Sequence, residues 1–158
     1  MCKGKNLLTL CITNSNIAIS NKTIGRQDME KNRKIATVIA ILANLSATIT
    51  EILVLLKVVP YEIIGGGRIG SYEEAVLLAG FSTFVQICII YCTAVASGIL
   101  EHKKIKKIAN VVLKVFIVYF AINIVMNLMG KTWFEKIYCS IICLVQIICF
   151  VIIIRKQK

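Results

Sequence analysis

Glu51 is the residue whose type and position most clearly point to chemistry in this sequence. It lies in the apolar segment 35–59, about five positions past the middle, or about 7 Å along a helix that rises ~1.5 Å per residue. A carboxylate at the centre of a membrane-spanning helix costs about 2.5–3.5 kcal/mol to insert, and rather less at this depth. Such a group needs a partner, a water-filled cavity or a bound proton.

Two interpretations of Glu51 stay open. Asn44, Thr48 and Glu51 fall at positions i, i+4 and i+7 and so share one helix face, which we expect to point into a bundle. The functional interpretation is proton or cation coupling, or ligand recognition. The structural interpretation is a packing residue that pairs with Arg68 or is capped by neighbouring amides.

A glycine-rich stretch over residues 61–74 (YEIIGGGRIGSYEE) is the second candidate site. Its three successive glycines permit tightly bent backbone, and their N–H groups beside Arg68 could form a nest that binds an anion. The alternative is a compact turn in which Glu62 pairs with Arg68. The stretch is not a nucleotide-binding motif, because no strand precedes the glycines.

The seven cysteines suggest a metal or redox site, but their predicted depths in the membrane argue against one. The second and fourth predicted helices both run toward the cytoplasm. The pair Cys88 and Cys92 is therefore offset by about 10 Å along the membrane normal from the pair Cys139 and Cys143. One zinc ion with ~2.3 Å bonds to sulfur cannot collect all four thiolates. With a single histidine and no nucleophile–base pair in sight, we expect no metal, no cofactor and no enzymatic activity.

Composition and hydropathy indicate which elements must position these residues. The chain is 58% hydrophobic with a mean hydropathy of +0.80, whereas a soluble domain is about 45–50% apolar. Four apolar segments, residues 35–59, 75–100, 108–129 and 137–154, each supply about the ~20 residues of a spanning helix. We therefore predict an all-α, integral membrane four-helix bundle with short loops over residues 29–158.

The basic residues predict the orientation of this bundle. The net charge of +11 comes from short clusters between the apolar segments, not from a basic stripe of the kind that binds nucleic acid. One side of the predicted membrane carries Lys31, Arg33, Lys34, Lys103, Lys104, Lys106, Lys107, Arg155, Lys156 and Lys158. The other side carries Arg68, Lys131 and Lys136, with Lys57 near the boundary. The positive-inside rule then places both termini in the cytoplasm.

Residues 1–28 differ from the rest of the chain. They are polar, rich in Asn, Ser and Thr, and show no helical periodicity. Their short apolar core makes them a poor signal peptide, whereas Met29 opens a basic stretch typical of the start of a bacterial membrane protein. We interpret residues 1–28 as a disordered or mis-annotated leader.

Local signals support the helices. Ser71 with Glu74, and Thr132 with Glu135, have the spacing of a capping box ahead of the second and fourth segments. The last three segments each carry a polar stripe, which we expect to form hydrogen bonds between helices. The stripe of the second segment is Ser82, Gln86, Thr93 and Ser97. The third segment carries Tyr119, Asn123 and Asn127, and the fourth carries Cys139, Cys143 and Gln146.

The stretches 61–74 and 123–136 (NIVMNLMGKTWFEK) resemble those of an uncharacterised family of small bacterial four-pass integral membrane proteins. The resemblance covers the bundle from about Ile35 onward and implies its topology, but it implies no activity. It draws interest to Glu62, Arg68, Asn123, Asn127, Lys131 and Glu135, and it suggests that the two outer loops form one surface. The predicted ligand-binding residues are Glu51, Glu62, Gly65, Gly66, Gly67, Arg68, Asn123 and Asn127.

Taken together, the sequence predicts a non-enzymatic accessory or binding protein of the cell membrane. Its outer face would engage a lipid headgroup or a small anion through Arg68 and the glycine N–H groups, with Glu51 beneath. The alternative is a small proton-coupled transporter that uses Glu51. The expected partners are membrane lipids and either a second copy or another membrane protein, and not nucleic acid.

Overall fold

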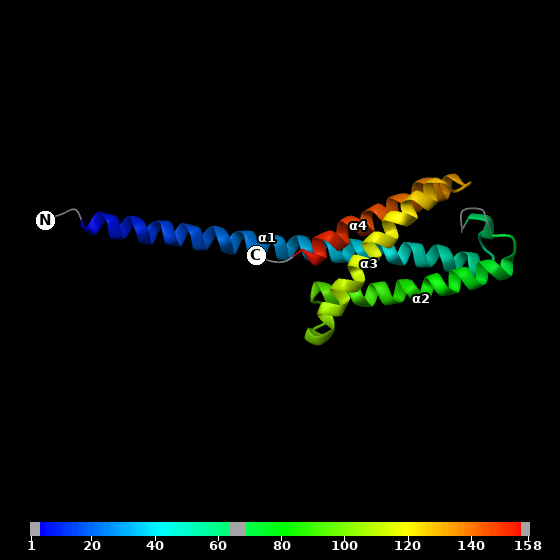
Figure 1. Ribbon diagram of the computed structural model, residues 1–158, viewed down its shortest axis with the longest axis horizontal. Helices are drawn as coiled ribbons and strands as arrows, with labels where there is room; N and C mark the ends of the chain where they lie inside the picture. The colour runs from blue at the N-terminus through cyan, green and yellow to red at the C-terminus, as the bar shows by residue number, and fades with distance from the viewer. Residues whose placement is uncertain (1–3, 64–68, 156–158) are drawn as a thin grey trace. The chain divides into compact units, whose positions relative to one another are not determined.

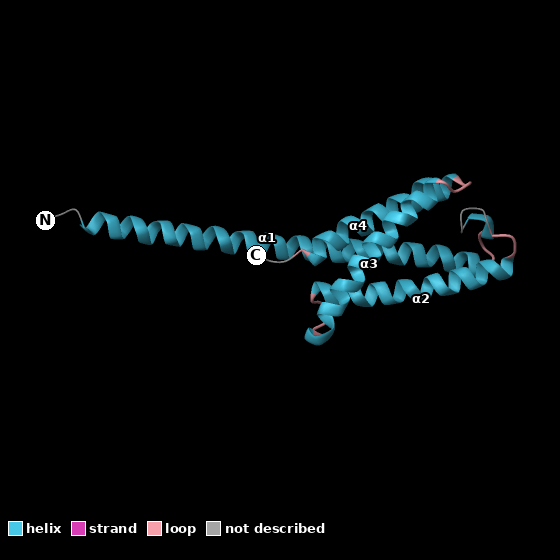
Figure 2. Ribbon diagram, viewed as in Figure 1, coloured by secondary structure: helices cyan, strands magenta, loops and turns pink. Residues whose placement is uncertain are grey.

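The computed structural model describes residues 4–63 and 69–155 and is all-helical (Figure 1). About 86% of the chain is helix, and the described part contains no strand (Figure 2). The predicted all-α class is therefore confirmed. The chain divides into two units, of which one is residues 33–155 and the other contains residues 1–32. All contacts below lie within residues 33–155.

The helices follow the apolar segments. In chain order they are α1 (Gly4–Leu55), a short 3₁₀ turn η1 (Tyr61–Ile63), α2 (Tyr72–Ser97), α3 (Lys103–Leu128), a π-helical segment η3 (Glu135–Cys139) and α4 (Ser140–Ile154). Four stretches are long and apolar enough to cross a membrane: Thr23–Leu55, Tyr72–Ser97, Lys104–Leu128 and Glu135–Ile154. Each overlaps one predicted segment.

Helix α1 extends well upstream of the predicted first segment. It begins at Gly4, so it includes most of the residues interpreted as a leader. The described backbone of residues 4–28 is helical, although their sequence shows no helical periodicity. Whether the native protein contains this segment stays a prediction.

Capping groups explain where α2 begins and ends. The Glu74 N–H donates to Ser71 Oγ at 3.3 Å, as the predicted capping box requires. The Glu74 carboxylate accepts from the N–H of Gly70 at 3.0 Å, one residue earlier than the sequence predicted. The helix stops at Gly98, whose φ of 88° is the left-handed conformation that glycine adopts without steric cost.

The fourth helix starts less regularly than predicted. The Glu135 N–H donates to Thr132 Oγ1 at 3.3 Å, which satisfies the first half of the expected capping box. The Thr132 hydroxyl also donates to Glu135 Oε2 at 3.0 Å. The following turn is π-helical from Glu135 to Cys139, a local widening that often occurs at functional sites.

Small and branched apolar residues form the core of this unit. Helix α3 packs against α4 and α2 (Figure 1). Ala36, Ala40, Ala96 and Ala109 are at most 3% exposed, and such small residues let helix backbones approach closely. Large buried side chains, Ile89, Leu113 and Phe150, fill the remaining space.

The outward faces of the helices are apolar. Leu77 is 78% exposed, Phe84 64% and Ile108 62%, and similar residues recur along all four helices. A soluble monomer rarely exposes so much contiguous apolar surface. Together with the length of the helices, this surface is typical of a membrane protein.

The polar face of α1 points into the bundle, as its spacing predicted. Asn44 is 3% exposed, and the Thr48 hydroxyl donates to Gln86 Oε1 on α2. From α4, Gln146 Nε2 donates to the Ala40 carbonyl at 3.0 Å. These hydrogen bonds join α1 to two other helices.

Candidate functional site

Glu51 is held by three side chains of α2. Its Oε1 accepts from Ser82 Oγ at 2.5 Å and from Gln86 Nε2 at 2.9 Å, and its Oε2 accepts from Thr83 Oγ1 at 3.0 Å. Hydrogen bonds to a charged group are the stronger ones in proteins. The carboxylate is therefore oriented by the helix opposite it.

This arrangement follows from helix geometry. Ser82 and Gln86 lie one turn apart on the same face of α2, while Thr83 follows Ser82 directly. The Thr48 hydroxyl donates to Gln86 Oε1, so the Gln86 amide is positioned with its nitrogen toward Glu51. A carboxylate offers about four acceptor positions, of which these three donors use three.

Glu51 lines a cavity of about 360 Å³ among the helices. The walls come from α1, α2 and α3, and from the start of the fourth helix. Small-molecule pockets are typically about 300–1,000 Å³, mostly apolar, with few polar groups. The cavity falls within that range, and most of its lining side chains are apolar or aromatic.

A second carboxylate lines the same cavity. Glu135 on η3 is 3% exposed and accepts a hydrogen bond from Thr132 Oγ1 at 3.0 Å. Cys139, the last residue of η3, also lines the cavity. No Lys, Arg or His occurs among the described lining residues.

Two amides and several aromatic rings complete the lining. Asn127 Nδ2 donates to Cys143 Sγ at 3.8 Å, a weak interaction, and Asn123 lines the cavity one turn earlier on α3. Five aromatic side chains contribute to the walls: Phe81, Tyr119, Phe120, Phe134 and Tyr138. The rings of Phe134 and Tyr138 stack with their centroids 4.6 Å apart.

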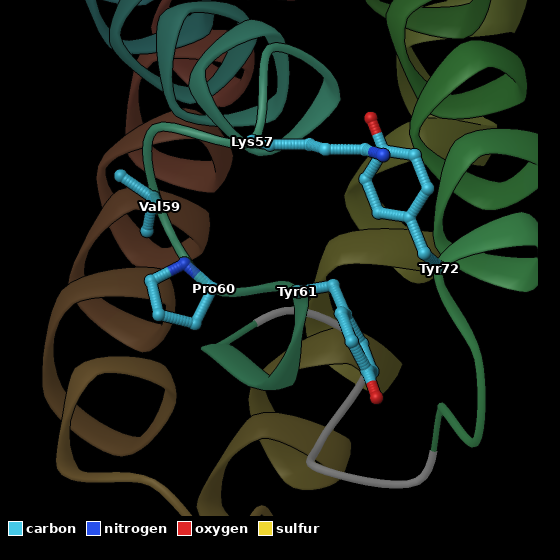
Figure 3. A pocket seen from close by; sticks show the side chains of 5 residues that line it. All are labelled: Lys57, Val59, Pro60, Tyr61 and Tyr72. Carbon is cyan, nitrogen blue, oxygen red and sulfur yellow. The ribbon is translucent and has the colours of Figure 1, made fainter.

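A smaller pocket of about 270 Å³ lies just beyond the end of α1. It is lined by Lys57, Val59, Pro60, Tyr61 and Tyr72, as Figure 3 shows. The Lys57 Nζ lies 4.3 Å from the centroid of the Tyr72 ring, a cation–π contact. The Tyr72 hydroxyl donates to the Leu55 carbonyl and so caps α1. Among the described lining residues of this pocket, Lys57 is the one with a cationic side chain.

The predicted ligand-binding residues fall into two groups. Glu51, Asn123 and Asn127 come together in the larger cavity. Glu62 is exposed on η1 and lines neither pocket. Gly65, Gly66, Gly67 and Arg68 lie outside the described residues, and so does the proposed anion-binding nest.

Sequence reasoning missed other members of the site. Thr83 lies outside the polar stripe drawn through Ser82 and Gln86, yet it donates to Glu51. Glu135 was expected to cap a helix and was among the residues to which the resemblance drew interest, but it was not a predicted ligand-binding residue; it lines the cavity. Its position after a Thr at capping-box spacing was the only local signal, and that signal does not indicate burial.

No protein-family model, curated protein or solved structure matches the chain. Any function proposed for it therefore rests on the geometry of the site.

Proposed function

We propose that the protein is a four-pass protein of a bacterial cell membrane with both termini in the cytoplasm. The four long apolar helices and their apolar outward faces support insertion into a bilayer. The excess of Lys and Arg on one set of loops supports the orientation. The resemblance of residues 61–74 and 123–136 to a bacterial family supports the source.

The activity that we propose is non-enzymatic binding of a small ligand in the Glu51 cavity. The observation that carries this proposal is a carboxylate held by three donors on α2 while it lines a cavity. A carboxylate needed only for packing would not require the adjoining space. Asn123 and Asn127 supply further hydrogen-bonding groups in the same lining.

A cavity-filling variant tests this function. The purified protein in lipid nanodiscs is heated with benzyltrimethylammonium, with its neutral isostere neopentylbenzene, or with benzylsulfonate. At least one probe should stabilise the wild type, by ~2.7 kcal/mol at a concentration of 100 times Kd. Ala47 lines the cavity, so Ala47→Leu should abolish that stabilisation.

The control substitution is Ala121→Leu on the exposed side of α3, which adds the same atoms away from the cavity. It should leave the stabilisation intact. If none of the three probes stabilises the wild type, the proposed binding function is wrong.

An outer-face site for a lipid headgroup or a small anion stays a prediction. The Lys57 pocket at the end of α1 supports it, because Lys57 is a cation beside two tyrosines. The geometry favours the Glu51 cavity over this site, since the cavity is larger and its polar groups are held by hydrogen bonds.

Proton-coupled transport is the second candidate function, favoured by the fact that Glu51 both lines the cavity and can hold a proton. The other titratable groups among the described lining residues are Tyr119, Glu135, Tyr138, Cys139 and Cys143. In proteoliposomes, a coupled transporter should show pH-dependent flux of benzyltrimethylammonium that Glu51→Gln removes. Retained binding with no flux in the wild type would leave binding as the function and exclude transport of this probe.

A further inference from the structure

Two basic side chains from different helices converge at the C-terminal end of α2. A Cβ added at Gly98, the C-cap of α2, would lie 3.7 Å from Lys106 Nζ on α3 and 3.8 Å from Arg33 Nη2 on α1. Both nitrogens therefore lie beside the same point. Arg33 is 18 positions before Glu51, or about 27 Å along a helix that rises ~1.5 Å per residue. The pair is thus separate from the Glu51 cavity.

Small buried residues bring the two cations to this junction. Ala36 follows Arg33 by three positions on α1, and Ala109 follows Lys106 by three positions on α3. With Ala96, near the end of α2, these two alanines belong to one buried core cluster, and each is at most 3% exposed. Because alanine lets helix backbones approach closely, the three helices meet here and the two long side chains reach the same place.

Neither cation is neutralised by a carboxylate of the chain. All eight Asp and Glu residues lie among the described residues, and none of them forms an ion pair with Arg33 or Lys106. Both basic side chains are half-buried, whereas their neighbours Lys104 and Lys107 are exposed. Two like charges held together in partly buried positions repel each other, since water screens them less than it screens exposed charges.

Capping of α2 accounts for these cations only in part. A cation near the C-terminus of a helix is stabilised by the helix dipole. The last carbonyls of α2 are already satisfied by the backbone, however. The Gly98 N–H donates to the Val95 carbonyl at 3.2 Å, and the Leu100 N–H donates to the Ala94 carbonyl at 3.1 Å. The guanidinium and the ammonium therefore keep their N–H donors for another acceptor.

Exposed apolar side chains adjoin the pair and indicate the class of that acceptor. Ile99 follows Gly98 and is 59% exposed, and further exposed residues continue along α3 at Ile108, Val111 and Val115. A soluble anion would leave this apolar surface uncovered. A phospholipid would present its phosphate to the cations and its acyl chains to the apolar surface. Basic pockets between membrane helices are known to bind anionic headgroups in this way.

We propose that Arg33 and Lys106 bind the phosphate of an anionic phospholipid where α1, α2 and α3 meet. The guanidinium and the ammonium donate to the phosphate oxygens in charge-assisted hydrogen bonds. Gly98 has no side chain to fill the space beside the two nitrogens, and the acyl chains lie along the exposed apolar side of α3. The site goes beyond the proposed ligand binding in the Glu51 cavity and shares with it only the location in a membrane.

Three probes test the ligand class on the full-length wild-type protein. Their affinities are measured by native mass spectrometry in detergent. Dioleoylphosphatidylglycerol is anionic, dioleoylphosphatidylcholine has the same acyl chains on a zwitterionic headgroup, and glycerophosphoglycerol is the anionic headgroup without acyl chains. A cation beside a headgroup contributes about fivefold in affinity. The anionic lipid should therefore bind at least about tenfold more tightly than either of the other probes.

Paired substitutions locate the site. The double variant Arg33→Gln/Lys106→Gln should lower the affinity for the anionic lipid by at least about tenfold and leave that for the zwitterionic lipid unchanged. The matched control is Lys104→Gln/Lys107→Gln, which removes the same charge from exposed side chains of α3. It should leave the affinity for the anionic lipid within about twofold.

The possible results separate the lipid site from its alternatives. If the zwitterionic lipid binds as tightly as the anionic one, or the control weakens binding as much as the paired variant, the proposed site is wrong. If glycerophosphoglycerol binds as tightly as the lipid, the pair binds a soluble anion and the lipid is wrong. The wild-type comparison of lipids decides the question even if a variant fails to fold. Failure of either site leaves the other untouched, because the Glu51 cavity is tested with different probes.

Discussion

Replacing Glu51 with leucine should lower the free energy of unfolding by about 1–3 kcal/mol, because three hydrogen bonds between α1 and α2 are lost. The Ser82 and Thr83 hydroxyls can turn back to carbonyls of their own helix, which limits the loss. The Gln86 amide nitrogen has no such substitute. Glu51→Gln should cost less than about 1 kcal/mol, since a glutamine can keep all three contacts once the Thr83 hydroxyl reverses its direction.

A double-mutant cycle checks this expectation. Unfolding of Glu51→Leu, Gln86→Leu and the double variant is followed in mixed micelles as denaturing detergent is added. Residues that share a hydrogen bond should show a coupling energy of about 0.5 kcal/mol or more. Glu73→Leu, at an exposed position of α2, is the control and should be nearly neutral. A leucine at position 51 that stabilises the protein would show that the network does not hold the two helices together.

The fold was predictable because its determinants are local. Each helix overlaps a continuous apolar segment, and length and hydropathy can be read from consecutive residues. The start of α2 was equally predictable, because its capping box is formed by Ser71 and Glu74. These two residues are three positions apart, so the signal does not depend on any other part of the chain. The inward face of α1 followed from the spacing of Asn44, Thr48 and Glu51.

The cavity was not predictable because it depends on how the helices converge. Glu51 and Glu135 are 84 positions apart, and no periodicity brings residues at that distance together. The π-helical turn at Glu135 also changes which side chains of the fourth helix face inward, and the sequence carries no sign of it. Asn123 and Asn127 were singled out from a polar stripe and a resemblance, which named the residues and left their position relative to Glu51 open.

Thr83 shows a limit of stripe patterns on a helix. It lies about 100° around the helix from Ser82, so a stripe drawn through Ser82 and Gln86 leaves it out. Glu51 contacts both residues because its two carboxylate oxygens accept separately, Oε1 from Ser82 and Oε2 from Thr83. A pattern that represents each residue by one direction misses contacts of this kind.

Replacing Gly130 with alanine should destabilise the protein and disturb the cavity together. Gly130 is buried in the turn before η3, and an added Cβ would lie 2.8 Å from Glu135 Oε2 and 3.0 Å from the Asn127 carbonyl oxygen. Overpacking of this kind typically costs about 1–3 kcal/mol. Because Glu135 lines the cavity, its displacement should also weaken binding of whichever of the three probes stabilises the wild type.

Gly80→Ala is the matched control, because the same methyl group there meets nothing within 4 Å. Gly80 lies inside α2, where alanine is favoured over glycine by about 0.5–1 kcal/mol, so this variant should raise the free energy of unfolding and leave binding unchanged. The two substitutions therefore differ in sign for the same chemical change. Equal effects on unfolding, or normal binding of that probe by a folded Gly130→Ala protein, would contradict the placement of Glu135 against Gly130 at the edge of the cavity.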